Sequence, residues 1–231
     1  MLSKGKTELK KPENPYLYRI LSFERVVQIL ESGNLYFSHP SKWDDPYENA
    51  IEKSALKSMY AQCWCSKGVS DAMWRIYSPK KIGVRIKIRK DALTLALRSA
   101  AKSINSKAVI KKVAYLPESE VKKKIAAIYK KLKATNDPAL AINALFYKRL
   151  AYSHESEYRV VLYDVSGKNG SIDKGLSVKV DPYQLIDSIL FDPRAPDEIV
   201  RAFKFYLKES INFHKSITKS SLYKGLVKRE I

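Results

Sequence analysis

The chain has 231 residues, 45% of them hydrophobic, and carries a formal net charge of +19. This length supports a sizeable core, and the lack of any stretch of 18 apolar residues excludes a membrane-spanning helix. The polar, lysine-rich first 15 residues lack the apolar centre of a secretory signal, so we expect a cytoplasmic protein with no membrane partner.

Hydrophobic periodicity and turn residues predict strands and helices that follow one another without a regular βαβ rhythm. In chain order, strands are predicted at 16–20, 34–38, 60–66, 82–88, 109–116, 157–164, 176–180 and 188–191, and helices at 23–32, 48–58, 70–77, 91–103, 117–133, 138–150 and 196–210. This order favours the α+β class, as a single domain with mixed or antiparallel sheets and flanking helices.

The domain is expected to occupy residues 16–231, with a basic helical insertion at about 89–150. Residues 1–15 are expected to be a flexible basic arm, because Pro12 and Pro15 oppose helix there. The sequence contains neither the glycine motif of dinucleotide-binding folds nor a P-loop motif. It also contains no internal repeat that would divide the chain.

The positive charge is concentrated in two segments. Residues 79–133 contain 17 Lys and Arg against 3 Asp and Glu, a net charge of +14, and residues 201–231 contain 8 against 2, a net charge of +6. Like charges at this density repel one another, and a partner carrying phosphates would compensate them. The lysines predicted to contact nucleic acid are Lys111, Lys112, Lys122, Lys123, Lys124, Lys130 and Lys131. A solvated helix face, an acidic antitoxin-like protein and an anionic membrane surface are the alternatives.

Cysteine and histidine offer no metal site. Cys63 and Cys65 are two residues apart on a predicted strand and are interpreted as two packed thiols. The three histidines are scattered along the chain, so no zinc site is expected. A metal-dependent nuclease using Asp44, Asp45 and Glu48 is a weaker hypothesis, because no other residues complete a ligand set.

Two carboxylates at the start of the strand at 157–164 are the strongest candidates for chemistry. Glu155 and Glu157 are expected to share one face, where they repel unless one is paired, and Arg159 on the same face can supply that pair. One carboxylate can stabilise positive charge developing on a sugar carbon, while the other orients or deprotonates a nucleophile. The alternative is a solvated strand start with an ordinary Glu–Arg pair.

Other candidates for ligand binding lie near the N-terminus. Tyr18 and Arg19 can hold a phosphate or diphosphate, because arginine presents a planar fork of donors. Trp43, Trp74 and Tyr77 can stack on a base or a nicotinamide ring, although packing also explains aromatic residues on a short helix. The same polar and aromatic cluster includes Ser38 and Asp45.

Taken in order, these motifs resemble a bacterial family of unknown function, DUF2971, whose pattern includes LYKYR, NDPFE, MW and ExEYR segments. The resemblance spans about residues 16–225 and is carried by 17–19, 35–40, 43–48, 63–66, 73–74, 77, 83–84, 155–159 and 192–194. The sequence departs from the pattern at Trp43 and Asp44, where the family has Phe-Asn, and in a shortened stretch at 77–83.

That family in turn is similar to ADP-ribosyltransferase toxins with an Arg, a Ser and a Glu-x-Glu motif, which implies an ADP-ribosyltransferase-like fold and NAD as substrate. On this resemblance Arg19 holds NAD, Glu157 is the catalytic glutamate at the nicotinamide ribose, and Glu155 acts on the acceptor side. Ser38 and Ser66 are both candidates for the serine.

The prediction is therefore an NAD-dependent ADP-ribosyltransferase that modifies RNA or DNA, acting as a toxin or a phage-defence effector. The charge distribution, and not the resemblance, motivates the nucleic-acid acceptor. The alternative is a non-catalytic nucleic-acid binding module, with phosphates on the lysine-rich helix and bases stacked on Trp43 or Trp74.

Overall fold

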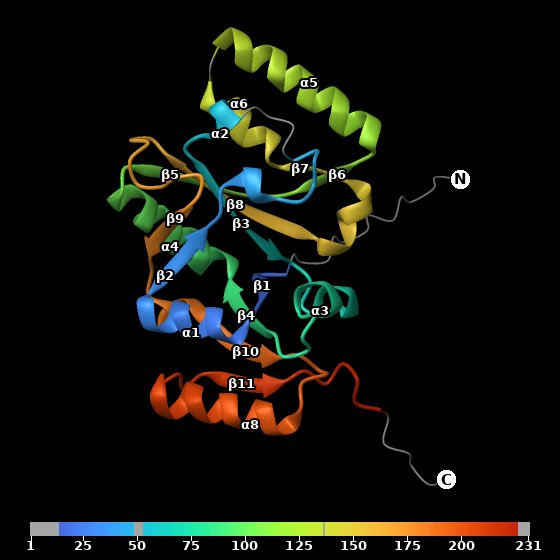
Figure 1. Ribbon diagram of the computed structural model, residues 1–231, viewed down its shortest axis with the longest axis vertical. Coiled ribbons are helices and arrows are strands. Elements are labelled where there is room, and N and C mark those ends of the chain that lie inside the picture. The colour runs from blue at the N-terminus through green and yellow to red at the C-terminus, as the bar shows by residue number, and fades with distance from the viewer. Residues whose placement is uncertain (1–13, 49–52, 136, 226–231) are drawn as a thin grey trace, which may run out of the picture.

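The computed structural model describes residues 14–48, 53–135 and 137–225. The strands are β1 (Tyr16–Leu21), β2 (Asn34–Phe37), β3 (Met59–Cys65), β4 (Val84–Arg89), β5 (Ser106–Lys112), β6 (Ala114–Leu116), β7 (Tyr147–Arg149), β8 (Glu157–Asp164), β9 (Leu176–Lys179), β10 (Ile186–Phe191) and β11 (Ser216–Lys219). Seven of them form one sheet in the order β11-β10-β4-β1-β3-β8-β5, and β2-β9 and β6-β7 form two smaller sheets (Figure 1).

Helices flank the sheet, and the pairing is mostly antiparallel, so the predicted α+β class is confirmed. The helices are α1 (Phe23–Ser32), α2 (Lys53–Leu56), α3 (Asp71–Tyr77), α4 (Lys90–Ser103), α5 (Glu118–Thr135), α6 (Pro138–Ala144), α7 (Pro182–Leu185) and α8 (Asp197–Phe205), with shorter turns η1 (Pro40–Lys42), η2 (Leu150–Glu155) and η3 (Tyr206–Ser210). Figure 1 places α5 and α8 at opposite ends of the molecule.

The strand β8 lies between two hydrophobic cores. Val160 and Leu162 face a core that includes residues of α1, α4 and α8, whereas Val161 faces a second core with α5 and α6. Successive side chains of a strand point to opposite faces, so a strand covered on both sides is hydrophobic throughout. This double cover fixes the start of β8, where the candidate carboxylates lie.

The main sheet separates between β1 and β3. Among the described residues these strands are paired at one position, Tyr18 with Cys65, whereas β1 pairs with β4 along its whole length and β3 pairs likewise with β8. The two halves of the sheet therefore diverge from a single paired position. The divergence leaves room for side chains of β1 and β3 to line a cavity.

The segment that follows β4 differs from the prediction in two places. The strand expected at 109–116 is divided into β5 and β6, because the chain changes partner after Val113: Val113 still donates its backbone N–H to Glu157 of β8, whereas Ala114 donates to Phe146 and β6 pairs with β7. The helix expected at 138–150 ends at Ala144, and the strand β7 follows it and pairs in parallel with β6. Tertiary pairing here overrides the helical preference of an Ala- and Leu-rich segment.

The C-terminal segment also differs from the prediction. No strand is predicted after residue 191, but the strand β11 is present and pairs in parallel with β10. The helix expected at 196–210 changes after Phe205 into the π-helical turn η3. Of the helix expected at 48–58, α2 is described, and residues 49–52 lie outside the described residues.

Most of the expected basic arm, residues 1–13, also lies outside the described residues. Within the expected insertion at 89–150, α4 and β5 belong to the main core and sheet, whereas α5 and α6 build the second core. No helix in the described part of the chain is long and apolar enough to cross a membrane.

Candidate active site

A cavity of about 330 Å³ lies where β1 and β3 diverge. Its wall includes eight of the nine residues predicted to act in catalysis or substrate binding, which are Tyr18, Arg19, Ser38, Trp43, Trp74, Tyr77, Glu155 and Glu157. The ninth, Asp45, does not line it and instead forms an ion pair of 3.0 Å with Arg149. Segments far apart in the sequence thus meet around one space.

The strand β1 supplies one positively charged side chain to the cavity wall, that of Arg19. Its guanidinium forms no hydrogen bond or ion pair with the residues that the structure describes, and its central carbon lies 6.0 Å from the centre of the Trp64 ring. Burial lowers the pKa of Arg19 to about 10, against smaller opposing effects of Cys63 and Tyr77. A desolvated guanidinium without a counter-charge is a site for an anionic ligand.

Aromatic side chains form much of the remaining wall. Trp74 on α3 is almost fully buried, and Trp43 stacks on the guanidinium of Arg159 with a separation of 4.2 Å. Tyr77, at the end of α3, donates a hydrogen bond of 3.1 Å to Glu155. Burial, followed by the charge of Glu155, raises the pKa of Tyr77, so the phenol remains a donor. Flat apolar surfaces beside polar groups suit a heteroaromatic ring.

The two carboxylates reach the cavity from different local structures. Glu155 ends the turn η2, Ser156 adopts a left-handed conformation (φ +45°), and β8 begins at Glu157. The expected pair of glutamates on one strand is therefore corrected, because the kink at Ser156 separates them. Ser66 holds this kink with backbone and side-chain hydrogen bonds to Ser156, whereas the other candidate serine, Ser38, lines the cavity.

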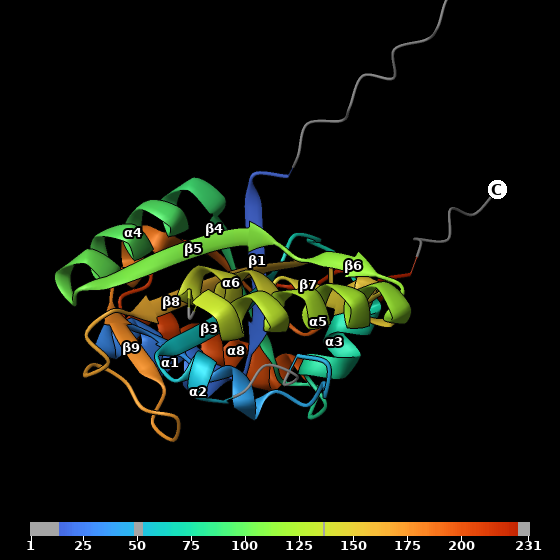
Figure 2. The same ribbon diagram turned by 90° about the horizontal axis from the view of Figure 1, so that it is seen from above.

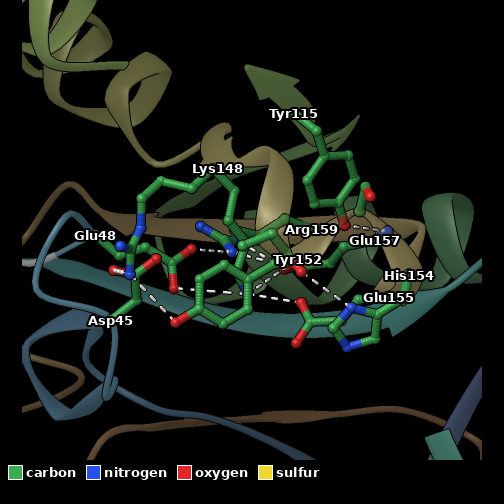
Figure 3. A network of polar contacts seen from close by, with 12 residues as sticks. Asp45, Glu48, Tyr115, Lys148, Tyr152, His154, Glu155, Glu157 and Arg159 are labelled. Atoms are coloured by element: carbon green, nitrogen blue, oxygen red, sulfur yellow. Dashed lines mark hydrogen bonds and ion pairs between the residues drawn. The ribbon is translucent and has the colours of Figure 1, made fainter. Parts of the chain in front are cut away.

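A buried network of opposite charges supports both glutamates (Figure 3). Arg159 binds both oxygens of Glu157 at 2.7 and 2.9 Å and one oxygen of Glu48 at 2.5 Å. Lys148 lies 2.6 Å from Glu155, 3.5 Å from Glu157 and 3.8 Å from Glu48. All five side chains are at most 11% exposed, so three carboxylates share two cations away from water.

The network shifts the pKa values of Glu157 and Glu48 in opposite directions. Burial favours the protonated form of both, but the charge and hydrogen bonds of Arg159, together with Lys148, outweigh burial at Glu157 and lower its pKa. At Glu48 burial prevails over the same two cations, and the pKa is raised. Glu157 is therefore held ionised, while Glu48 takes up a proton before Glu157 does as the pH falls.

Sequence reasoning found part of this network. The predicted pairing of Arg159 with one of the glutamates is confirmed, with Glu157 as its partner. Lys148 and Glu48 were not recognised as neighbours of the glutamates, because they come from β7 and from the loop after η1. A lysine within a predicted helix and a glutamate in an acidic loop carry no signal of this contact.

Two carboxylates of the acidic loop at 44–48 form ion pairs with arginine side chains of the same chain. Asp45 is paired with Arg149 and Glu48 with Arg159. In the described ranges, no group of three or more His, Cys, Asp or Glu side chains is arranged to hold a metal ion. These carboxylates therefore serve as partners of arginine in this structure.

The lysines predicted to contact nucleic acid are all exposed, and we call them the basic surface. Lys111 and Lys112 lie on β5, and the remaining five lie on α5. Figure 2 shows α5 and β5 on the same side of the molecule. The first turn of α5 contacts the loop beside the network, because Glu118 accepts a hydrogen bond of 2.6 Å from Tyr47 and lies 3.8 Å from Arg149.

Comparison with known proteins gives two results. The family described as "Protein of unknown function (DUF2971)" matches residues 73–160, which confirms the predicted resemblance over this segment, and no curated protein matches the chain. Similar solved structures include DarT of Thermus sp. 2.9 in complex with NAD+, at 12% identity and a TM-score of 0.42 over 90% of this chain and 96% of that chain. DarT in complex with ADP-ribosylated single-stranded DNA matches at 11% identity and a TM-score of 0.43 over 90% and 94%. The chain is thus similar to DUF2971 proteins in its central segment and distantly similar to DarT along its length.

Proposed function

We propose that this chain is an ADP-ribosyltransferase that uses NAD as its substrate and modifies nucleic acid. The observation that carries the proposal is the distribution of charge around the cavity. An unpaired arginine on β1 faces the space from one half of the sheet, and two glutamates face it from the other, with tryptophan and tyrosine rings between them. NAD has the matching order of groups, with a negatively charged diphosphate, a ribose and a positively charged nicotinamide ring.

In this proposal Arg19 binds the diphosphate, and Trp43, Trp74 and Tyr77 enclose the nicotinamide ring. Glu157 accepts a hydrogen bond from a hydroxyl of the nicotinamide ribose. A carboxylate has about four acceptor positions, so Glu157 can accept this bond while it remains bound to Arg159. Its fixed negative charge stabilises the positive charge that develops on the ribose.

The bond changes follow from this placement. The bond between the ribose C1′ and the nicotinamide nitrogen breaks, and its electron pair neutralises the departing ring. A nucleophilic nitrogen or oxygen of the acceptor forms the new bond to C1′ and loses its proton, for which Glu155 is the acceptor. Lys148 and Tyr77 both bind Glu155 and hold its carboxylate at the cavity wall.

The basic surface supports nucleic acid, RNA or single-stranded DNA, as the acceptor class. Its seven lysines are exposed and lie on the side of the molecule where α5 contacts the loop beside the glutamate network. Phosphates bound there would release counterions and give salt-dependent affinity. Action in the cytoplasm as a toxin or phage-defence effector, with an acidic antitoxin that covers the basic surface, extends the same proposal.

The test incubates the purified protein with labelled NAD and, separately, total RNA, single-stranded DNA and lysate protein. Glu157→Gln is tested beside it, with the exposed Glu198→Gln as the matched control. We expect label on nucleic acid with the wild type and the control, and a loss of at least about 100-fold in Glu157→Gln. If label appears on lysate protein alone, the acceptor is a protein and not nucleic acid.

A non-catalytic nucleic-acid binding module is the second candidate, because the basic surface does not depend on the cavity. Absence of label on every acceptor, together with unchanged oligonucleotide binding by Glu157→Gln, would establish it instead. Changing Lys122, Lys123 and Lys124 to Gln should weaken oligonucleotide binding. In a plot of the logarithm of the binding constant against the logarithm of the salt concentration, the slope should become shallower by about 0.7 for each lost phosphate contact. The same change at the exposed cations Arg201, Lys208 and Lys224 is the control. The first two belong to α8 and to the turn η3 that follows it, and α8 lies at the end of the molecule opposite α5 (Figure 1).

A further inference from the structure

Three cations alternate along one face of β4, and one of them has no hydrogen-bond or ion-pair partner among the described residues. Lys87 forms an ion pair of 2.6 Å with Asp187, and Arg89 forms one of 2.6 Å with Asp91. Arg85 forms no hydrogen bond or ion pair with the residues that the structure describes, and its Nε atom is buried without a partner. Sequence alternation alone places all three on a basic outer face and does not distinguish them.

The position of Arg85 explains this difference. Its half-buried side chain lines the same cavity as Arg19 but reaches it from the other face of the β1–β4 pair, because Ile20, and not Arg19, lies opposite Arg85. The guanidinium carbon lies 4.7 Å from the centre of the Tyr18 ring. Burial lowers the pKa of Arg85, against smaller effects of Tyr18 and Cys65. Arg85 therefore faces a ligand space and not a carboxylate.

The Tyr18 ring that Arg85 covers is fixed from another side. Asn14 lies 3.4 Å from the Tyr18 hydroxyl, and a Cβ atom at Gly68 would lie only 3.0 Å from the same ring. This close approach favours glycine at position 68, because an added Cβ atom would displace the ring by a few tenths of an ångström. A fixed ring restricts the rotamers of Arg85, so the guanidinium is placed in advance and loses little freedom when it binds a ligand.

Two guanidinium groups that line one cavity from the two faces of the β1–β4 pair, with no ion-pair partner among the described residues, fit a ligand with two negatively charged groups. Each guanidinium can donate two parallel hydrogen bonds to one phosphoryl group, and such charge-assisted pairs are the strong ones. A single monoanion would leave one of the two cations desolvated without compensation. Lys67, exposed on the same wall, adds further positive charge.

We propose that Arg85 and Arg19 form a two-arginine site for the diphosphate of NAD, in which Arg85 is a second phosphate-binding residue supplied by β4. This inference rests on the proposed function for the identity of the substrate. The inference predicts that the site binds a nucleoside diphosphate, and this binding can be measured without catalysis. Backbone phosphates of the acceptor strand are the other source of the same chemistry, and the experiment separates the two.

The experiment titrates ADP, adenosine and a single-stranded DNA oligonucleotide into the wild type and variants by calorimetry. Arg85→Gln is expected to weaken ADP binding about 10- to 100-fold and to leave adenosine and oligonucleotide binding unchanged. Arg19→Gln should behave in the same way. Arg89→Gln is the matched control, because it removes the same charge from the same face of β4, and it should bind ADP as the wild type does.

Arg85→Lys keeps the charge but not the fork of donors, so an intermediate affinity is expected for it. It also replaces Arg85→Gln if thermal unfolding shows that the latter is not folded. Equal ADP affinity in Arg85→Lys, Arg85→Gln and the wild type would overturn the inference. Weaker oligonucleotide binding with unchanged ADP binding would also overturn it and assign Arg85 to the acceptor strand.

Failure of this inference differs from failure of the proposed function. A wild type that consumes NAD while Arg85→Gln retains its KM would sink the two-arginine site and leave the transferase standing. A wild type that binds ADP through Arg85 but transfers no label from NAD would leave the site and sink the transferase. A wild type that does not bind ADP at all would refute the site directly.

Discussion

The two walls of the cavity carry opposite charges, and only the negative charges are paired within the described part of the protein. On the β8 side, Glu155 and Glu157 are buried and bound to Lys148 and Arg159. On the side of β1 and β4, Arg19 and Arg85 have no partner among the described residues. One wall satisfies its charges within the protein, and the other leaves them to be satisfied from outside.

This difference separates two tasks of a binding site. Paired, buried carboxylates keep one geometry and one ionisation state, which suits groups that must act on a reacting bond. Unpaired cations lower the stability of the empty protein and recover that free energy when an anion binds. The wall without partners should therefore govern affinity, and the paired wall should govern the chemical step.

The largest contrast should appear in the free energy of unfolding. Arg159→Met leaves Glu48 and Glu157 buried without their principal cation, and we expect a loss of about 3–5 kcal/mol. Arg19→Met, which removes a desolvated cation that has no partner, should leave the unfolding free energy unchanged or raise it. Urea denaturation of both variants measures the contrast, and equal losses in the two would contradict the difference between the walls.

A second prediction concerns the pH dependence of NAD consumption. The charge of Lys148 contributes to lowering the pKa of both Glu157 and Glu48. Without it both pKa values rise, and because Glu157 must be ionised to act, the acid limb of the pH–rate profile should move to higher pH in Lys148→Met. Lys148→Arg retains the positive charge and should keep the limb near its original position. A lower rate with an unmoved acid limb in Lys148→Met would reduce Lys148 to a packing role.

The smallest effect is expected at Gly68, which shapes the arginine wall indirectly. Gly68→Ala places a methyl group 3.0 Å from the Tyr18 ring, so the ring and the overlying Arg85 must shift by a few tenths of an ångström. A loss of up to about 1 kcal/mol in binding corresponds to roughly a fivefold weaker ADP affinity. Gly225→Ala, with open space around the added atom, should leave ADP affinity unchanged.

Local sequence patterns predicted those helices and strands whose conformation depends mainly on their own residues. The alternation of Val84, Ile86 and Ile88 places β4 correctly, and Gly33, in a left-handed conformation, ends α1 where expected. The strands β7 and β11 depend on partners elsewhere in the chain, so the segment of β7 is predicted as part of a helix and β11 is not predicted at all. Pairing between distant segments is not visible in a window of ten residues.

The candidate site divides in the same way. The ordered motifs predicted most of the residues that line the cavity, because each carries a recognisable side chain in a recognisable place. The contacts of Lys148 and Glu48 arise from packing of β7 and the loop after η1 against β8, and no spacing along the chain encodes them. The missing partner of Arg85 is likewise a property of the folded sheet, since its neighbours on β4 have the same charge and periodicity.

The strands β1 and β3 are paired at one position only among the described residues, and this affects how the protein can change over evolutionary time. The backbone ladders that hold the fold run between β1 and β4 and between β3 and β8, on either side of the seam. Side chains that line the gap, such as Ser38 and Met73, contribute little to those ladders. Substitutions there can accumulate without refolding the sheet, so new substrate preferences should arise first along this seam, and libraries for directed evolution should begin with it.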